Sequence, residues 1–113
     1  MSQHFFDATL GTQNLRVQIG WDKPMQWFYC VVYPLIVEDG NTVTDEPVYS
    51  NLYEDNPKQC DLNYFLELLL ERFEIKLPED MIECVKQDQK HNIVNRGPLF
   101  HTVESNYSKS FWL

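Results

Sequence analysis

The stretch from Leu62 to Phe73 carries the most regular pattern in the chain and constrains its fold more than any other. Six large apolar residues recur there at spacings of three and four: Leu62, Phe65, Leu66, Leu69, Leu70 and Phe73. This spacing places the side chains on one face of an α-helix, because a helix completes a turn every ~3.6 residues. We therefore predict an amphipathic helix over residues 61–74, with Asp61 as its N-cap, and expect it to supply the centre of the core.

A shorter helical pattern follows directly. Pro78 suits the start of a helix, because it has no N–H to satisfy there, and the two acidic residues after it complement the positive end of the helix dipole. Met81 and Val85 are spaced for contact with a core. These features predict a second helix over residues 78–90.

The residues before the helices carry strand patterns. Leu15, Val17 and Ile19 alternate with polar residues, as expected for an antiparallel strand with one buried face. Residues 25–33 are rich in aromatic and β-branched side chains, which favour a central strand.

The order of these patterns predicts an α+β fold in a single domain spanning residues 1–113. We expect a small antiparallel, meander-like sheet of three to five strands between about residues 3 and 52, with the two helices packed on one of its faces. Residues 91–113 are predicted to form an irregular or strand-like tail. The opposite face or the edge of the sheet would then be free for a partner.

Charge is distributed unevenly along the chain. Residues 38–83 carry thirteen acidic residues against three basic ones, a net charge of −10, within a chain whose total is −8. An acidic surface of this kind keeps a protein in solution, and it also attracts a basic partner. We expect no direct binding to a nucleic-acid backbone, because the sequence has no cluster of Lys and Arg to neutralise phosphates.

Cysteine usage and hydropathy bear on location. Cys30, Cys60 and Cys84 are widely spaced and odd in number, which fits reduced thiols better than a disulfide framework. The sequence contains no apolar run long enough to span a bilayer and no secretory signal pattern, so we expect a cytoplasmic location and no membrane contact.

Motifs for catalysis or cofactor binding are absent from the sequence. The histidines and cysteines do not have metal-ligand spacing, and no phosphate-binding or nucleophile motif occurs, so we expect no metal, no cofactor and no enzymatic activity. An alternative is a small enzyme that uses the Cys60 thiol, which precedes a predicted helix N-terminus, or a pair of carboxylates. The acidic neighbour Asp61 opposes activation of that thiol.

Exposed aromatic and acidic residues are the candidate contacts of a protein interface. Tryptophan and tyrosine concentrate binding energy at interfaces, and turns rich in acid present charge to a partner. The candidate binding residues are Trp21, Asp39, Asp45, Glu46, Tyr53, Glu54, Asp55 and Trp112.

These observations favour a small acidic protein-binding module acting on a basic partner, such as an inhibitor, an immunity protein or an antitoxin-type protein. A second alternative to this function is a structural subunit that forms a homo-oligomer through the apolar C-terminal residues Phe111, Trp112 and Leu113.

Overall fold

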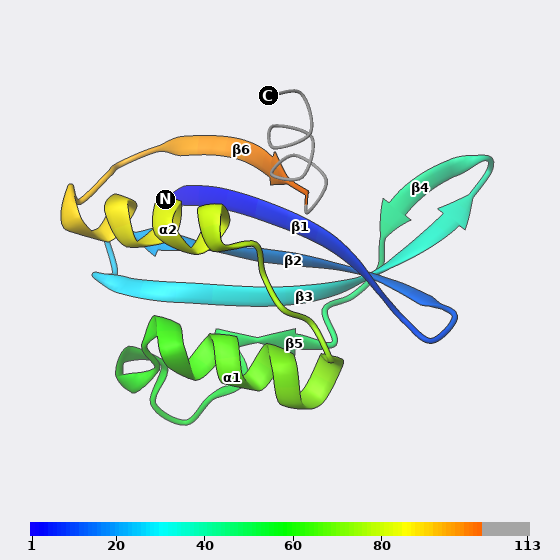
Figure 1. Ribbon diagram of the computed structural model, residues 1–113, viewed down its shortest axis with the longest axis horizontal. Helices are drawn as coiled ribbons and strands as arrows, with labels where there is room; N and C mark the ends of the chain where they lie inside the picture. Colours follow the sequence, from blue (N-terminus) through cyan, green and yellow to red (C-terminus); the bar gives the residue numbers. More distant parts are fainter. Residues whose placement is uncertain (103–113) are drawn as a thin grey trace, which may run out of the picture.

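The computed structural model describes residues 1–102 and shows the predicted α+β fold, in which two helices follow most of a curled sheet (Figure 1). The strands are β1 (Ser2–Leu10), β2 (Gln13–Asp22), β3 (Trp27–Glu38), β4 (Asn41–Thr44), β5 (Tyr49–Ser50) and β6 (Arg96–His101). The helices are α1 (Leu62–Phe73) and α2 (Glu79–Lys90), and two short 3-10 turns, η1 (Asn51–Tyr53) and η2 (Pro57–Gln59), precede α1.

The sheet is mixed, so the expectation of a pure meander is wrong. Strands β1 to β4 are paired consecutively and antiparallel, in the spatial order β4-β3-β2-β1-β6, and β5 pairs with β3. Strand β6 pairs with β1 in parallel. The physical reason is the connection: the chain crosses the helix layer after β5 and returns along the free edge of β1, as parallel pairing requires.

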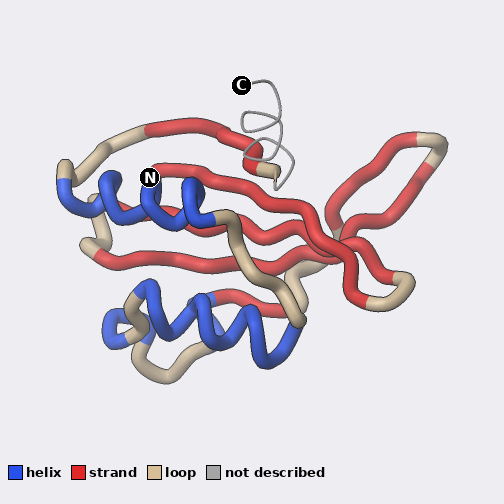
Figure 2. Tube along the Cα trace, viewed as in Figure 1, coloured by secondary structure: helices blue, strands red, loops and turns tan. Residues whose placement is uncertain are grey.

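The core lies between the sheet and the helices. Leu15, Val17 and Ile19 on β2 are at most 1% exposed, as their alternation predicts. Their partners on β3 include Cys30 and Val32, which are fully buried. Figure 2 shows both helices as separate blue segments, with the long strands running behind and between them.

Helix α1 is confirmed, but its buried face differs from the predicted one. The Asp61 carboxylate accepts a hydrogen bond of 2.8 Å from the Tyr64 N–H, which is the predicted N-cap. Leu68 is 5% exposed and belongs to the core, whereas Leu70 is 56% exposed. The apolar surface of α1 is wider than the sheet can cover, so Leu70 and the half-buried Leu66 remain at the edge of the core.

Helix α2 is confirmed as well, with Met81 and Val85 fully buried. Pro78 lies immediately before the first helical turn. Asp88 is also fully buried, one turn after Val85, at a position that the spacing assigns to the core. Of the predicted tail, residues 96–101 form β6, and residues 103–113 lie outside the part of the chain described here.

Candidate functional site

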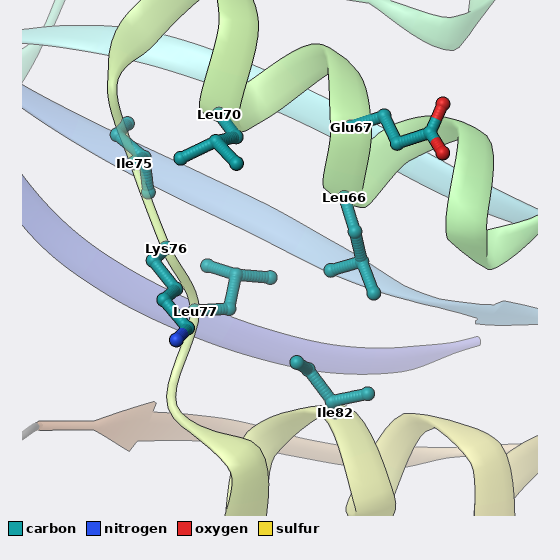
Figure 3. Close-up of a pocket in the computed structure, with 7 residues that line it drawn as sticks. All are labelled: Leu66, Glu67, Leu70, Ile75, Lys76, Leu77 and Ile82. Carbon is teal, nitrogen blue, oxygen red and sulfur yellow. The ribbon is translucent and has the colours of Figure 1, made fainter.

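A groove of about 290 Å³ runs between the two helices and the link that joins them (Figure 3). It is lined by Leu66, Glu67 and Leu70 from α1, by Ile75, Lys76 and Leu77 from the link, and by Ile82 from α2. Most of these side chains are aliphatic, so the groove offers an apolar surface with one acidic and one basic group.

The end of α1 positions the floor of this groove. Glu74 adopts a left-handed backbone with φ of 55°, which turns the chain sharply out of the helix. The Ile75 N–H then donates to the Leu69 carbonyl at 3.0 Å. The turn buries Ile75 and Leu77 to 2% and 3% exposure, so the link is fixed in the core while Glu74 and Lys76 are exposed.

The wall on α1 consists of Leu66 and Leu70. They are one helical turn apart, so they lie one above the other on the same face. Figure 3 shows both extending from α1 into the space that Ile82 of α2 faces from the other side. Leu66 and Ile82 are half-buried and Leu70 is exposed, so apolar surface remains accessible here.

Acidic residues predominate on the exposed surfaces of both helices and the link. Six exposed acidic residues lie between residues 62 and 86: Glu67, Glu71, Glu74, Glu79, Asp80 and Glu83. Three exposed basic residues occur in the same span: Arg72, Lys76 and Lys86. Within residues 1–102, none of these six carboxylates forms an ion pair, and the span keeps a net charge of −3.

Trp21, one of the residues predicted for binding, belongs to the core instead. The strand β2 continues through it, its side chain is 5% exposed, and its ring packs edge-on against Phe28 with centroids 5.3 Å apart. The indole N–H donates to Asn92 Oδ1 at 2.9 Å. The turn begins only after Asp22, so Trp21 is not available as a surface anchor.

The acidic candidates fall into two separate groups. Asp39 lies in the β3–β4 turn, and Asp45 and Glu46 directly follow β4. The hairpin that carries Asp39 projects from the body of the molecule, at the end opposite to the loops that precede α1 (Figure 1). The sequence candidates therefore do not form one surface.

The second group begins at the end of η1 and comprises Tyr53, Glu54 and Asp55. Tyr53 and Asp55 are exposed, but Glu54 is half-buried. Its Oε2 accepts hydrogen bonds from the hydroxyls of Tyr49 at 2.8 Å and Tyr64 at 3.0 Å. Glu54 thus ties the loop to α1. Trp112 lies outside the described residues.

The environment of the cysteines opposes thiol reactivity. Burial, with smaller effects of Glu54 and Asp61, raises the pKa of Cys60. Cys60 is 9% exposed, and its thiol donates to the Asn56 carbonyl at 3.6 Å. Cys30 is completely buried, and burial also raises the pKa of Cys84. None of the three thiols has the lowered pKa that a nucleophile needs.

A buried polar cluster connects β1, α2 and β6, and the sequence reasoning missed it. His4 and Asp88 are fully buried, and His4 Nε2 is 2.6 Å from Asp88 Oδ2. The other nitrogen of His4, Nδ1, is 2.9 Å from His101 Nε2. Asp88 Oδ1 lies 2.9 Å from Arg96 Nη1, although the angle there is poor for a hydrogen bond. The sequence did offer a signal for this cluster, because His4 occupies a core position of a strand and Asp88 a core position of a helix.

No protein-family model, curated protein or solved structure matches the chain. Neither helix within residues 1–102 is long and apolar enough to cross a bilayer. In the same residues, no group of three His, Cys, Asp or Glu side chains converges as metal ligands. At the α1–α2 groove, a concave and mostly apolar surface remains accessible.

Proposed function

We propose that this chain is a non-enzymatic protein-binding module whose α1–α2 groove receives apolar side chains from a basic, amphipathic segment of a partner protein. The observation that carries the proposal is the apolar groove of about 290 Å³ between helices whose exposed surfaces are acidic. An amphipathic helix laid in an apolar groove is a common mode of peptide recognition.

The apolar part of the proposal follows from Leu66, Leu70 and Ile82. Leu70 is 56% exposed, so its burial by a partner favours binding. Complete burial of an aliphatic side chain contributes about 1.5–3 kcal/mol to the free energy of binding. Two apolar side chains that lie one turn apart on a partner helix match the spacing of Leu66 and Leu70.

The electrostatic part follows from the six carboxylates on the helices and the link, which form no ion pair and outnumber the three basic residues there. Their field attracts a basic segment over a range of about 10 Å at moderate ionic strength and raises the rate of encounter. An acidic partner is repelled. This asymmetry supports an inhibitor, immunity or antitoxin-type role, in which a small acidic protein covers a basic target.

The two alternative functions have less support. A thiol enzyme needs an activated cysteine, and the raised pKa of Cys60 argues against that role. A homo-oligomer formed through residues 111–113 would use a segment outside the described residues. Removal of residues 107–113 tests this alternative, because an unchanged sedimentation mass excludes that role for the tail. All three cysteines are free thiols, which suits a reducing compartment. We therefore propose a cytoplasmic location.

The test is an NMR titration with a designed peptide of about 18 residues, or five helical turns, that carries leucine on one face and lysine on the other. We expect amide shifts concentrated in residues 66–82. Leu70→Gln removes apolar surface without adding charge, and we expect it to weaken binding by about ten- to hundred-fold.

The matched control is Val37→Gln, which makes the same kind of change at an apolar side chain that is 76% exposed on the β3–β4 hairpin. It should leave the affinity unchanged. A peptide with glutamate in place of lysine should not bind. Equal loss in both variants, or shifts spread over the sheet instead of the helices, would contradict the proposed function.

A further inference from the structure

A second concave site lies on the face of the sheet that the helices do not cover. It is a recess of about 280 Å³ whose lining includes Gln18, Asp22, Trp27, Tyr29, Tyr33 and Leu52. From this site we infer that the protein binds the side chain of an arginine on a partner molecule. This surface is separate from the α1–α2 groove, so the inference does not depend on the proposed function.

The register of β2 and β3 brings these side chains together. Asp22 pairs with Trp27 and Gly20 pairs with Tyr29, and alternate residues of a strand share a face. Gly20 contributes no side chain to this face, and a Cβ there would lie 2.2 Å from the Ser2 carbonyl oxygen. The Ser2 carbonyl therefore occupies the space that a side chain at position 20 would take, and it lies beside the Tyr29 hydroxyl that donates to it.

Hydrogen bonds fix the polar groups in the recess. The Gln18 amide nitrogen donates to the Tyr29 hydroxyl oxygen at 3.2 Å, and the Gln18 amide oxygen accepts from the Tyr33 hydroxyl at 3.3 Å. The Tyr29 hydroxyl donates to the Ser2 carbonyl at 2.6 Å. Burial, as the largest effect, raises the pKa of Tyr29 to about 12, so this ring stays neutral at physiological pH. The Tyr29 ring is consequently an uncharged, hydrogen-bonded part of the aromatic wall.

The Asp22 carboxylate supplies the charge that selects a cation. It is half-buried, and its Oδ1 accepts a hydrogen bond from the Met25 N–H at 3.3 Å. Among residues 1–102 no basic side chain pairs with it. The ammonium of Met1, another lining residue, donates instead to the Val94 carbonyl and to Asn95 Oδ1. Asp22 is thus a carboxylate without a cation in a recess that three aromatic rings line.

The same sheet face already holds one arginine in this type of environment. Arg16 makes two hydrogen bonds to the Asp7 carboxylate, at 2.7 and 2.9 Å, and its guanidinium carbon is 5.1 Å from the centroid of the Phe100 ring. A planar guanidinium satisfies a carboxylate and stacks on a ring at once, which a lysine ammonium does less well. Arginine is for this reason the occupant that Asp22, Trp27 and Tyr33 suit best.

The experiment is a titration of the full chain with N-acetyl-arginine amide, followed by the indole N–H resonance of Trp27. The uncharged isostere N-acetyl-citrulline amide is the comparison probe. We expect the arginine probe to shift the Trp27 resonance, and Asp22→Asn to weaken its binding by about five- to thirty-fold. Glu38→Gln, which removes one acidic charge from the exposed end of β3, should change the affinity by less than about two-fold.

Tyr33→Leu provides a second variant, which keeps a large side chain at this position but loses the aromatic face. It should weaken binding of the arginine probe, while the Trp27 resonance of the free protein keeps its chemical shift. Three results would overturn the inference: equal affinity for the citrulline probe, no loss of affinity in Asp22→Asn, or no shift of the Trp27 resonance at the solubility limit of the arginine probe.

Discussion

At the scale of single residues, the Asp88 carboxylate joins three elements that are distant in the sequence. One oxygen faces His4 of β1 and the other faces Arg96 of β6, and the carboxylate itself belongs to α2. Removal of a buried carboxylate leaves the polar groups that it contacts without their partner, which costs much more than loss of an exposed pair.

Asp88→Ala should therefore lower the free energy of unfolding by about 3–5 kcal/mol. The comparison is Asp7→Ala, which breaks a pair whose carboxylate side chain is 46% exposed and which should cost no more than about 1 kcal/mol. Urea unfolding followed by circular dichroism measures both changes. Equal losses in the two variants would show that the buried cluster contributes nothing beyond a surface pair.

His101 makes stability depend on pH. Burial, and secondly the neighbouring His4, lower the pKa of His101 below its ordinary value of 6.5. As pH falls below about 6.5, His101 takes up its proton in the unfolded chain before it does so in the folded chain. The free energy of unfolding therefore decreases until pH reaches the pKa of His101 in the folded chain. Below that pH, the contribution of His101 to the free energy of unfolding no longer changes. Asp80 opposes this shift and reduces its size.

Urea unfolding between pH 5 and pH 8 tests this prediction. His101→Gln should remove part of the loss of stability on the acid side, because the group that titrates is gone. His91→Gln should keep it, since His91 is exposed. The same pH dependence in His101→Gln as in the unaltered chain would rule His101 out as its source.

The sequence predicts where these polar residues lie but not what they touch. His4 precedes Phe6 by two residues on the same face of β1, and Asp88 follows Val85 by three on α2, so both occupy core positions. Their pairing joins residues 84 positions apart. Periodicity reports only on the local element, and it gives no information about a partner at that distance.

At the scale of elements, α1 has two apolar faces with different roles. Phe65 and Leu69 are completely buried in the core, whereas Leu70, the next residue along the helix, lines the groove. Two adjacent leucines thus differ in role, since Leu69 serves packing and Leu70 contributes to an accessible surface.

Paired substitutions separate the two faces. Leu69→Ala should lower the free energy of unfolding by about 2–5 kcal/mol, because it leaves a cavity in the core. Leu70→Ala should cost less than about 1 kcal/mol, because its side chain is 56% exposed. Thermal unfolding measures both. A comparable cost for Leu70→Ala would mean that the groove is closed in solution.

The boundaries of α1 and its cap are predictable from the sequence, because Asp61 and the apolar spacing are local signals. The division between core and groove is not, because the stripe of Leu66, Leu69 and Leu70 is wide enough to face the sheet from either side. Which leucine is buried depends on where the sheet lies, and that is set by residues far from the helix.

At the scale of the whole molecule, the two proposed binding surfaces lie on opposite sides of one sheet. The helix side offers an apolar groove among carboxylates, and the open side offers an aromatic recess with Asp22. Charge also separates along the chain, since residues 38–83 carry a net charge of −10 and the remainder carries +2. Both proposals therefore expect a partner that carries basic groups.

The affinity for the leucine–lysine peptide should fall by at least about ten-fold when salt rises from about 50 to about 500 mM, because screening shortens the range of the acidic field. Isothermal calorimetry at several salt concentrations gives this dependence. A peptide with glutamine in place of lysine serves as a control without charge pairing. Salt-independent affinity would mean that the carboxylates on the helices only aid solvation.

The antiparallel part of the sheet is predictable because consecutive strands pair through short turns. The placement of β6 is not, because its sequence is irregular: Pro98 has no N–H for a ladder, and all its residues except His101 are exposed. A strand of this kind is recognisable only once the free edge of β1 is known to lie beside it.

The pairing of β1 with β6 has a consequence for the order of folding. Strands β1, β2 and β3 can form their hairpins as soon as they leave the ribosome, since their contacts are local. The buried imidazole of His4 finds its partners only 84 and 97 residues later in the chain. During synthesis, one edge of β1 therefore remains unpaired until β6, near the end of the described residues, has been made. In that interval a second nascent chain can pair with the open edge.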